Sequence, residues 1–367
     1  MKINEVFPLF NNKLTGLLKI EHPIIQAPMA GGITTSKLVA EVSNAGGLGM
    51  IGAGYMTPAQ IRDQIKEIKQ LTKEPIGINL FVPNEFTFTE SEVNSANQLL
   101  QPIRNQLHIH QDKRIDIPTY ESLVETFKEQ VKLVIEERVP VCSFTFGIPP
   151  KEVIAELRTY GISLIGTATT VEEAIEVEKS GMNMVVAQGS EAGGHRGNFI
   201  SDSHDSLVGL MSLIPQIVDR VSIPVIAAGG IMDGRGLTAS LCLGALGVQM
   251  GTAFLTCIES GANQKYKEAI LRSSEDQIVL TRAFSGKWAR GIKNKFIAEM
   301  EKHEGVLPEF PVQNTLTQPI RKASSSQQNA DYLSLWSGQS PRLATTQSVR
   351  VLFNTILTEA KNIQNNF

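Results

Sequence analysis

The sequence has little cysteine, few aromatic residues and no excess of charge of either sign. Among its 367 residues are three cysteines, at positions 142, 242 and 257, and aromatic side chains make up 6%. An odd number of cysteines without a C-x-x-C pair supports neither a disulfide framework nor a thiolate zinc site, and it suits a reducing compartment. H-E-x-x-H is also absent. We therefore expect a cytoplasmic protein without a metal site.

Long apolar runs and dense basic clusters are lacking as well. No stretch nears 18 uninterrupted apolar residues, and the first residues carry charges and a proline where a signal peptide needs an apolar region. Lys and Arg number 34 against 37 Asp and Glu, which gives a formal charge of -3. With this balance of charges and no dense basic cluster, the chain lacks the positive surface that binds nucleic acid or a membrane, so we expect neither as a partner.

Short apolar runs alternate with segments of helical period along most of the chain. We expect eight strands, at residues 22–28, 48–52, 76–81, 140–146, 162–167, 183–188, 223–229 and 246–251. Most are continuously apolar, as strands buried on both faces are. Between them, segments such as 35–46 place apolar residues on one helical face. This alternation favours an α/β fold with a closed (β/α)8 TIM barrel over an open doubly wound sheet.

Two parts of the chain depart from this alternation. Residues 82–118 are polar and partly helical, and they indicate an insertion after the third strand, before its helix. Beyond residue 260 the pattern becomes mostly helical and then polar, so we expect 261–367 to be a C-terminal extension that packs on the barrel. We interpret residues 1–367 as a single domain.

Glycines mark a candidate phosphate site after the seventh and eighth strands. Gly229 and Gly230 follow one strand, and Gly251 and Thr252 follow the next. Barrel enzymes commonly bind phosphate at these two loops, where small residues let it approach backbone N–H groups. Glycines that only make βα turns are the alternative. By contrast, the G-x-G-x-x-G at 47–52 runs into a strand, opposite to a dinucleotide-binding turn.

Other candidate residues follow the remaining strands. His195 stands among glycines after the sixth strand, where a near-neutral pKa suits a general base or an anion binder, although a structural hydrogen bond is the alternative. Asn79 ends the third strand and could bind a cofactor edge or only its own loop. Phe144 and Phe146 lie in the last part of the fourth strand and could line a pocket or pack in the core, with core the simpler interpretation.

Several longer segments together resemble the nitronate monooxygenases, formerly called 2-nitropropane dioxygenases, above all their class I. The segments are HPIIQAPMAGG (22–32), SNAGGLGMIGAGY (43–55), INLFVP (78–83), SFTFGIP (143–149), AQGSEAGGHRG (187–197), PVIAAGGIMDGRG (224–236), GVQMGT (247–252), FSGKWARGIKNKF (284–296) and LWSGQSPRLA (335–344). Related FMN-dependent NAD(P)H reductases, which act on quinones or enoyl-acyl-carrier-protein, share some of these motifs and are the alternative function.

The resemblance implies an FMN-dependent (β/α)8 enzyme that oxidises alkyl nitronates with O2 to a carbonyl compound and nitrite. Propionate 3-nitronate is the expected substrate, detoxification the expected role, and a monomer or homodimer the expected state. The implied FMN contacts are Ala27, Pro28, Met29, Asn79, Gln188, Gly193, Gly229, Gly230, Gln249, Met250, Gly251 and Thr252, with His195 as the catalytic residue. Phe146, Lys287 and Arg290 are candidate substrate contacts, although the two cations could instead bridge surface acids.

Overall fold

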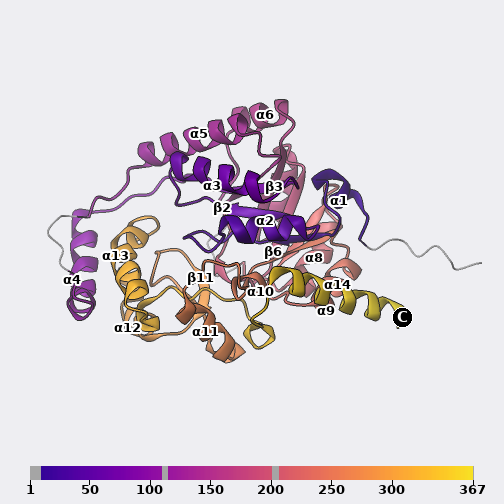
Figure 1. Ribbon diagram of the computed structural model, residues 1–367. Helices are drawn as coiled ribbons and strands as arrows, with labels where there is room; N and C mark the ends of the chain where they lie inside the picture. Colours follow the sequence, from indigo (N-terminus) through magenta and orange to yellow (C-terminus); the bar gives the residue numbers. More distant parts are fainter. Residues whose placement is uncertain (1–9, 110–114, 201–205, 367) are drawn as a thin grey trace, which may run out of the picture.

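Eight parallel strands form the centre of the computed structural model, which describes residues 10–109, 115–200 and 206–366 (Figure 1). They are β1 (Ile24–Gln26), β2 (Gly49–Gly52), β3 (Ile76–Phe81), β4 (Val141–Thr145), β5 (Ser163–Ala168), β6 (Met184–Gln188), β8 (Val225–Ala228) and β9 (Gly247–Met250). Their order is β1-β9-β8-β6-β5-β4-β3-β2, and a parallel bridge between Ile25 and Leu48 joins the two ends. The predicted (β/α)8 fold and all eight predicted strands are confirmed.

Helices surround this sheet in the order that a barrel requires. They are α2 (Ser36–Asn44), α3 (Pro58–Leu71), α5 (Tyr120–Glu136), α6 (Lys151–Thr159), α7 (Val171–Lys179), α8 (Leu210–Val218) and α9 (Gly234–Cys242), with α14 (Val349–Asn365) after β9. Caps set several of their starts. Thr57, for example, accepts from the N–H of Gln60 and is followed by proline at the first helical position, and together these two residues fix the start of α3.

The eighth barrel helix lies at the far end of the chain. Helix α14 packs along α9, where a Cβ on Gly234 would stand 2.6 Å from the carbonyl oxygen of Ile356. It also contacts α2, the helix that follows β1, and β1 is paired with β9. The segment predicted as an extension therefore ends by completing the barrel, and most of it is an insertion between the last strand and the last helix.

That insertion contains several short elements. They are α10 (Thr252–Leu255), α11 (Gln264–Arg272), α12 (Lys295–Met300), α13 (Val312–Ser326), the strands β10 (Ile278–Thr281) and β11 (Ala289–Ile292), and the 3-10 turns Glu275–Gln277, Glu301–Val306, Ala330–Tyr332 and Pro341–Leu343. Strand β11 lies between β10 and the short β7 (Gly194–His195), antiparallel to both. The sequence analysis did not predict this small sheet.

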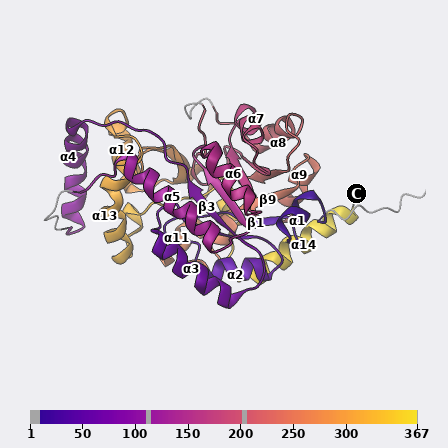
Figure 2. The same cartoon turned by 90° about the horizontal axis from the view of Figure 1, so that it is seen from above.

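The two irregular parts of the chain pack on each other. Between β3 and α5, as predicted, the 82–118 insertion forms α4 (Glu90–Gln106), and α4 lies beside α12 and α13 in both views (Figures 1 and 2). Leu100 and Leu316 belong to their shared apolar cluster. The buried Arg104 adds a hydrogen bond, donating from Nη2 to the carbonyl oxygen of Leu316 at 3.1 Å. Residues 110–114 of the insertion lie outside the described residues.

Apolar side chains fill the barrel itself. Ile25, Met50, Met184 and other strand residues form a layer inside it, and α1 (Lys13–Leu18) contributes Leu14 and Leu18 to the same cluster. Separate clusters fill the space between strands and outer helices. Among the described residues, no helix is both long and apolar enough to cross a bilayer.

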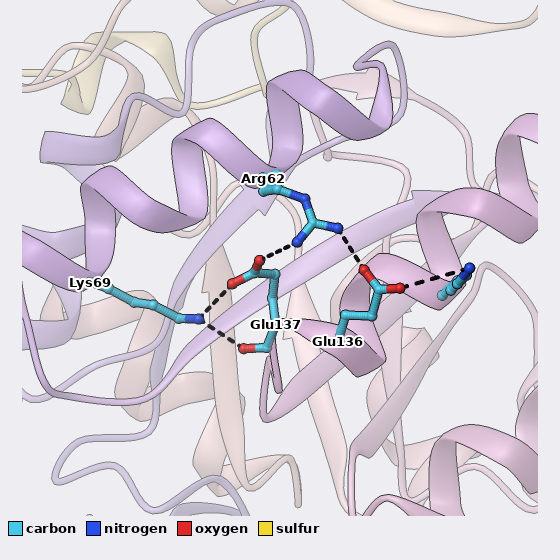
Figure 3. A network of polar contacts seen from close by, with 5 residues as sticks. Arg62, Lys69, Glu136 and Glu137 are labelled. Atoms are coloured by element: carbon cyan, nitrogen blue, oxygen red, sulfur yellow. Dashed lines mark hydrogen bonds and ion pairs between the residues drawn. The ribbon is translucent and has the colours of Figure 1, made fainter.

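An ion-pair network ties α3 to the end of α5 on the outside of the barrel (Figure 3). Arg62 contacts Glu136 at 2.5 Å and Glu137 at 2.7 Å, and Lys69 contacts Glu137 at 2.7 Å. Lys69 also donates to the main-chain oxygen of Glu137. Since the Arg62 and Lys69 side chains are exposed to solvent, each pair contributes little to stability, and the network mainly fixes how the two helices lie.

Candidate active site

A cavity with an empty volume of about 1170 Å³ opens at the carboxyl ends of the barrel strands. Residues at or just after the ends of all eight strands contribute to its wall, as expected for the ligand-binding face of this fold. The lining includes Ala27, Pro28, Met29, Tyr55, Asn79, Phe81, Thr145, Phe146, Thr167, Gln188, Gly193, His195, Gly229, Gly230, Gln249, Gly251 and Thr252. The structure thus brings nearly all the predicted cofactor contacts to one cavity; their roles stay predictions.

The glycines of the last two βα loops leave room at the cavity wall. A Cβ on Gly251 would meet only the side chains of Ala27 at 3.6 Å and Met29 at 4.0 Å, so hydrogen in its place leaves space next to the backbone. Gly229 and Gly230 have φ of +138° and +66°, which disfavours any other residue. Thr252 accepts from the N–H of Gly338 at 3.0 Å, so its own hydroxyl proton is available to another acceptor.

Asn79 and Gln188 already have partners in the protein. Asn79 donates from Nδ2 to the hydroxyls of Ser143 and Thr145, at 2.8 and 3.0 Å. Gln188 donates to the main-chain oxygen of His195 at 3.1 Å and accepts from the N–H of Gly197 at 2.8 Å. Gln188 therefore orders the loop that carries His195. Contacts of these two amides with a cofactor stay predictions.

His195 is held at the cavity wall by sheet pairing and by aromatic neighbours. It pairs with Ala289 of β11, and its ring lies against Trp336, Phe146 and Phe310, with centroids 5.4, 5.9 and 6.3 Å away. The Nε2 atom is 2.8 Å from the hydroxyl oxygen of Ser285. These contacts restrict both the position and the rotation of the imidazole.

Burial and positive charge keep this imidazole neutral. Desolvation, followed by the charges of Lys287 and Arg321, lowers the pKa of His195 to about 3. Lys287 places its ammonium group over the Phe146 ring, 5.1 Å from the centroid. Arg321 comes from α13, and burial lowers the pKa of its guanidinium as well. The site therefore combines an uncharged base with two cations.

Three predicted residues stand off the cavity wall. Met250 is a buried residue of β9, and Lys287 places its ammonium over the Phe146 ring without lining the cavity. Arg290 is buried, and its Nε donates to the main-chain oxygen of Ser190 at 2.7 Å. Arg290 therefore does not bridge surface acids, which was the alternative proposed for it, and the substrate roles of both cations stay predictions.

Sequence reasoning missed several residues at or near the cavity. Tyr266 and Trp336 line it from the insertion after β9, and the Tyr266 hydroxyl donates to the main-chain oxygen of Trp336 at 2.6 Å. Ser285 contacts His195, and Arg321 acts on its pKa. The segments 284–296 and 335–344 were noted as family-like, but no periodic pattern assigns their side chains to a barrel mouth.

Known proteins are similar to this chain over nearly its whole length. A sequence model of the family "Nitronate monooxygenase" matches residues 11–359. The chain belongs to the nitronate monooxygenase family. A probable nitronate monooxygenase of Staphylococcus haemolyticus (strain JCSC1435) is 53% identical over 356 residues, which are 96% of this chain and 98% of that protein. One from Staphylococcus aureus (strain Newman) is 51% identical over 354 residues, 96% and 98% of the two chains.

Solved structures agree with this membership. Nitroalkane oxidase from Streptomyces ansochromogenes has a TM-score of 0.87 at 37% identity, covering 96% of this chain and 99% of its own. FabK from Thermotoga maritima has a TM-score of 0.77 at 32% identity, covering 97% and 98%. The chain is accordingly an enzyme of this flavin-dependent oxidoreductase family, as the sequence resemblance implied, and the family match favours nitronate oxidation over the reductase alternative.

Proposed function

We propose that this enzyme binds FMN and oxidises small alkyl nitronates with O2, forming a carbonyl compound and nitrite. The observation that carries the proposal is the meeting of a glycine-lined wall and a neutral His195, flanked by two cations, in one cavity. The nitroalkane oxidase of Streptomyces ansochromogenes, similar over 96% of this chain, supports the substrate class.

The residues present fit FMN. The open space beside Gly251 lets a phosphate approach the backbone, and the Thr252 hydroxyl can donate to it. On the other side, the chain at Ala27, Pro28 and Met29 gives a wall of small and apolar groups suited to a flat ring. When bound, FMN supplies the electron acceptor, while the protein supplies orientation and electrostatics.

The charges near His195 favour an anionic substrate. Lys287 and Arg321 oppose protonation of His195, and for the same electrostatic reason they stabilise a negative charge placed beside it. A nitronate carries that charge, whereas a neutral nitroalkane must first lose a proton to a weak base. We therefore propose that preformed nitronates are better substrates than neutral nitroalkanes. Propionate 3-nitronate adds a carboxylate, which the same cations also favour.

Oxygen consumption with propionate 3-nitronate, without any nicotinamide and with nitrite measured in parallel, tests this function. We expect rapid oxygen uptake with nitrite formation. Failure of the flavin-loaded protein to consume oxygen contradicts the proposal. Bleaching of the flavin by NADH or NADPH under anaerobic conditions then identifies the reductase alternative.

The variant His195→Asn separates the two substrate forms. We expect it to retain flavin, because the glycine-lined wall is untouched, and to lose more turnover on neutral nitroalkanes than on preformed nitronates. An equal loss on both, with flavin retained, refutes the assignment of base function to His195. Detoxification of nitronates in the cytoplasm, by a monomer or homodimer, completes the proposed role.

A further inference from the structure

The hydroxyl of Ser285 lies between His195 and the main chain of Lys287. Ser285 is 1% exposed and belongs to the turn that connects β10 to β11. Its Oγ is 2.8 Å from Nε2 of His195, 3.0 Å from the carbonyl oxygen of Lys287 and 3.3 Å from the amide nitrogen of the same residue. Ser285 belongs to the family-like segment 284–296, and its contact with His195 connects that segment to a residue of the cavity wall.

These three contacts together favour one placement of the protons. A serine hydroxyl has one proton, whereas a carbonyl oxygen can only accept. The Ser285 hydroxyl donates to the carbonyl oxygen of Lys287 at 3.0 Å, which places its one proton on that side. The serine oxygen must then accept from its other neighbours. The Lys287 amide donates to it, and Nε2 of His195 must carry a proton to do the same.

We propose that Ser285 is a positioning residue that holds neutral His195 in the Nε2–H tautomer and leaves Nδ1 unprotonated for the substrate. The kinetic effect of this tautomer rests on the proposed function. The tautomer itself is inferred only from contacts within the chain. Because one ring nitrogen of neutral imidazole donates and the other accepts, fixing the Nε2 proton fixes the role of Nδ1. The lowered pKa of His195 keeps the ring in this neutral form.

The consequence is a division of tasks between the two nitrogens. With a neutral nitroalkane, the Cα–H bond breaks and the proton forms a bond to Nδ1. The electron pair moves into the new C=N bond and onto the nitro oxygens, which gives the nitronate. Nε2–H keeps its bond to Ser285 throughout, so the imidazolium formed is already hydrogen-bonded on its buried side. A preformed nitronate needs no such step.

The tautomer can be observed directly in purified, flavin-loaded protein labelled with 15N-histidine. His195 is assigned by comparison with His195→Gln. We expect one protonated, pyrrole-type nitrogen at Nε2 and one unprotonated, pyridine-type nitrogen at Nδ1. A protonated Nδ1 in the wild type overturns the proposal. Because this measurement does not depend on which substrate the enzyme oxidises, its outcome can be distinguished from a failure of the proposed function.

Variants of Ser285 test its role in catalysis. We expect Ser285→Ala to mix the two tautomers and to lower kcat/KM for a neutral nitroalkane by about tenfold, the loss typical of one buried hydrogen bond. Turnover of the preformed nitronate should change by no more than about twofold. Ser285→Thr should restore the two nitrogen signals of His195 and the kcat/KM for the neutral nitroalkane, because threonine keeps the hydroxyl. Ser240→Ala is the matched control, because Ser240 is also a buried serine bonded to a main-chain oxygen, on α9. Equal losses on both substrates, or an unchanged tautomer in Ser285→Ala, overturn the proposal.

Discussion

The low pKa of His195 predicts that this one side chain makes the fold sensitive to acid. The pKa is about 3 in the folded protein, against an ordinary value of about 6.5 in an unfolded chain. Between these two values the unfolded chain binds a proton that the folded protein does not. Stability therefore falls as the pH drops from about 6.5 towards 3, and this contribution is absent above neutral pH.

The size of the effect follows from the two pKa values. At about pH 5 an unfolded imidazole is almost fully protonated and His195 in the fold is almost fully neutral. The cost is about 1.5 pH units at about 1.4 kcal/mol each, or roughly 2 kcal/mol. At about pH 8 it is close to zero. Burial of the ring and the charges of Lys287 and Arg321 are the physical causes, in that order.

Urea unfolding of the wild type and of His195→Gln, at about pH 8 and about pH 5, measures this cost. Glutamine does not titrate and its amide can still reach Ser285, so the acid penalty should vanish in the variant. We expect the stability of the wild type relative to the variant to fall by roughly 2 kcal/mol between the two pH values, with both proteins at the same flavin concentration. His303→Gln, at an exposed position in the turn Glu301–Val306, is the control. A relative stability independent of pH refutes the conclusion that His195 is held neutral.

Three further predictions test the cavity, the thiols and the packing of the insertion. Gly251→Ala should fold normally, because its Cβ has space, but should weaken FMN binding about tenfold in a fluorescence titration of the apoprotein; unchanged affinity would place the phosphate elsewhere. In native protein a thiol reagent should modify only Cys242 rapidly, since the other two cysteines are buried; a second fast thiol contradicts this. Leu316→Ala should cost about 2–5 kcal/mol in urea unfolding, because the fully buried side chain packs in the cluster shared with α4; a cost under about 1 kcal/mol would show that this cluster adds little.

The barrel could be predicted from the sequence because its signals are local. Strands such as β6 and β8 are short apolar runs, and the helices between them have one apolar face, so periodicity alone identifies both. Glycine signals at Gly229 and Gly251 were equally local. Because both glycines follow parallel strands of one barrel, the sequence alone predicts that they lie at the same end of that barrel.

The end of the chain could not be predicted in the same way. Helix α14 has an ordinary amphipathic pattern, and nothing local distinguishes a barrel helix from one in an extension. Its place against α9 depends on Gly234 allowing close approach to Ile356. The small sheet that carries His195 was missed because β7 is two residues long and has no periodicity to detect.

The sequence by itself determined the (β/α)8 fold, the glycine-rich loops after the last two strands and the position of His195 after β6, since each depends on residue types close together in the chain. Only the tertiary structure decided the state of that histidine. Its hydrogen-bond partner Ser285 lies 90 residues away, and Lys287 and Arg321 come from the insertion after β9. The burial of a side chain and the electric field that acts on it depend on all its neighbours in space. The pKa and the tautomer of one histidine therefore depend on how the whole chain folds.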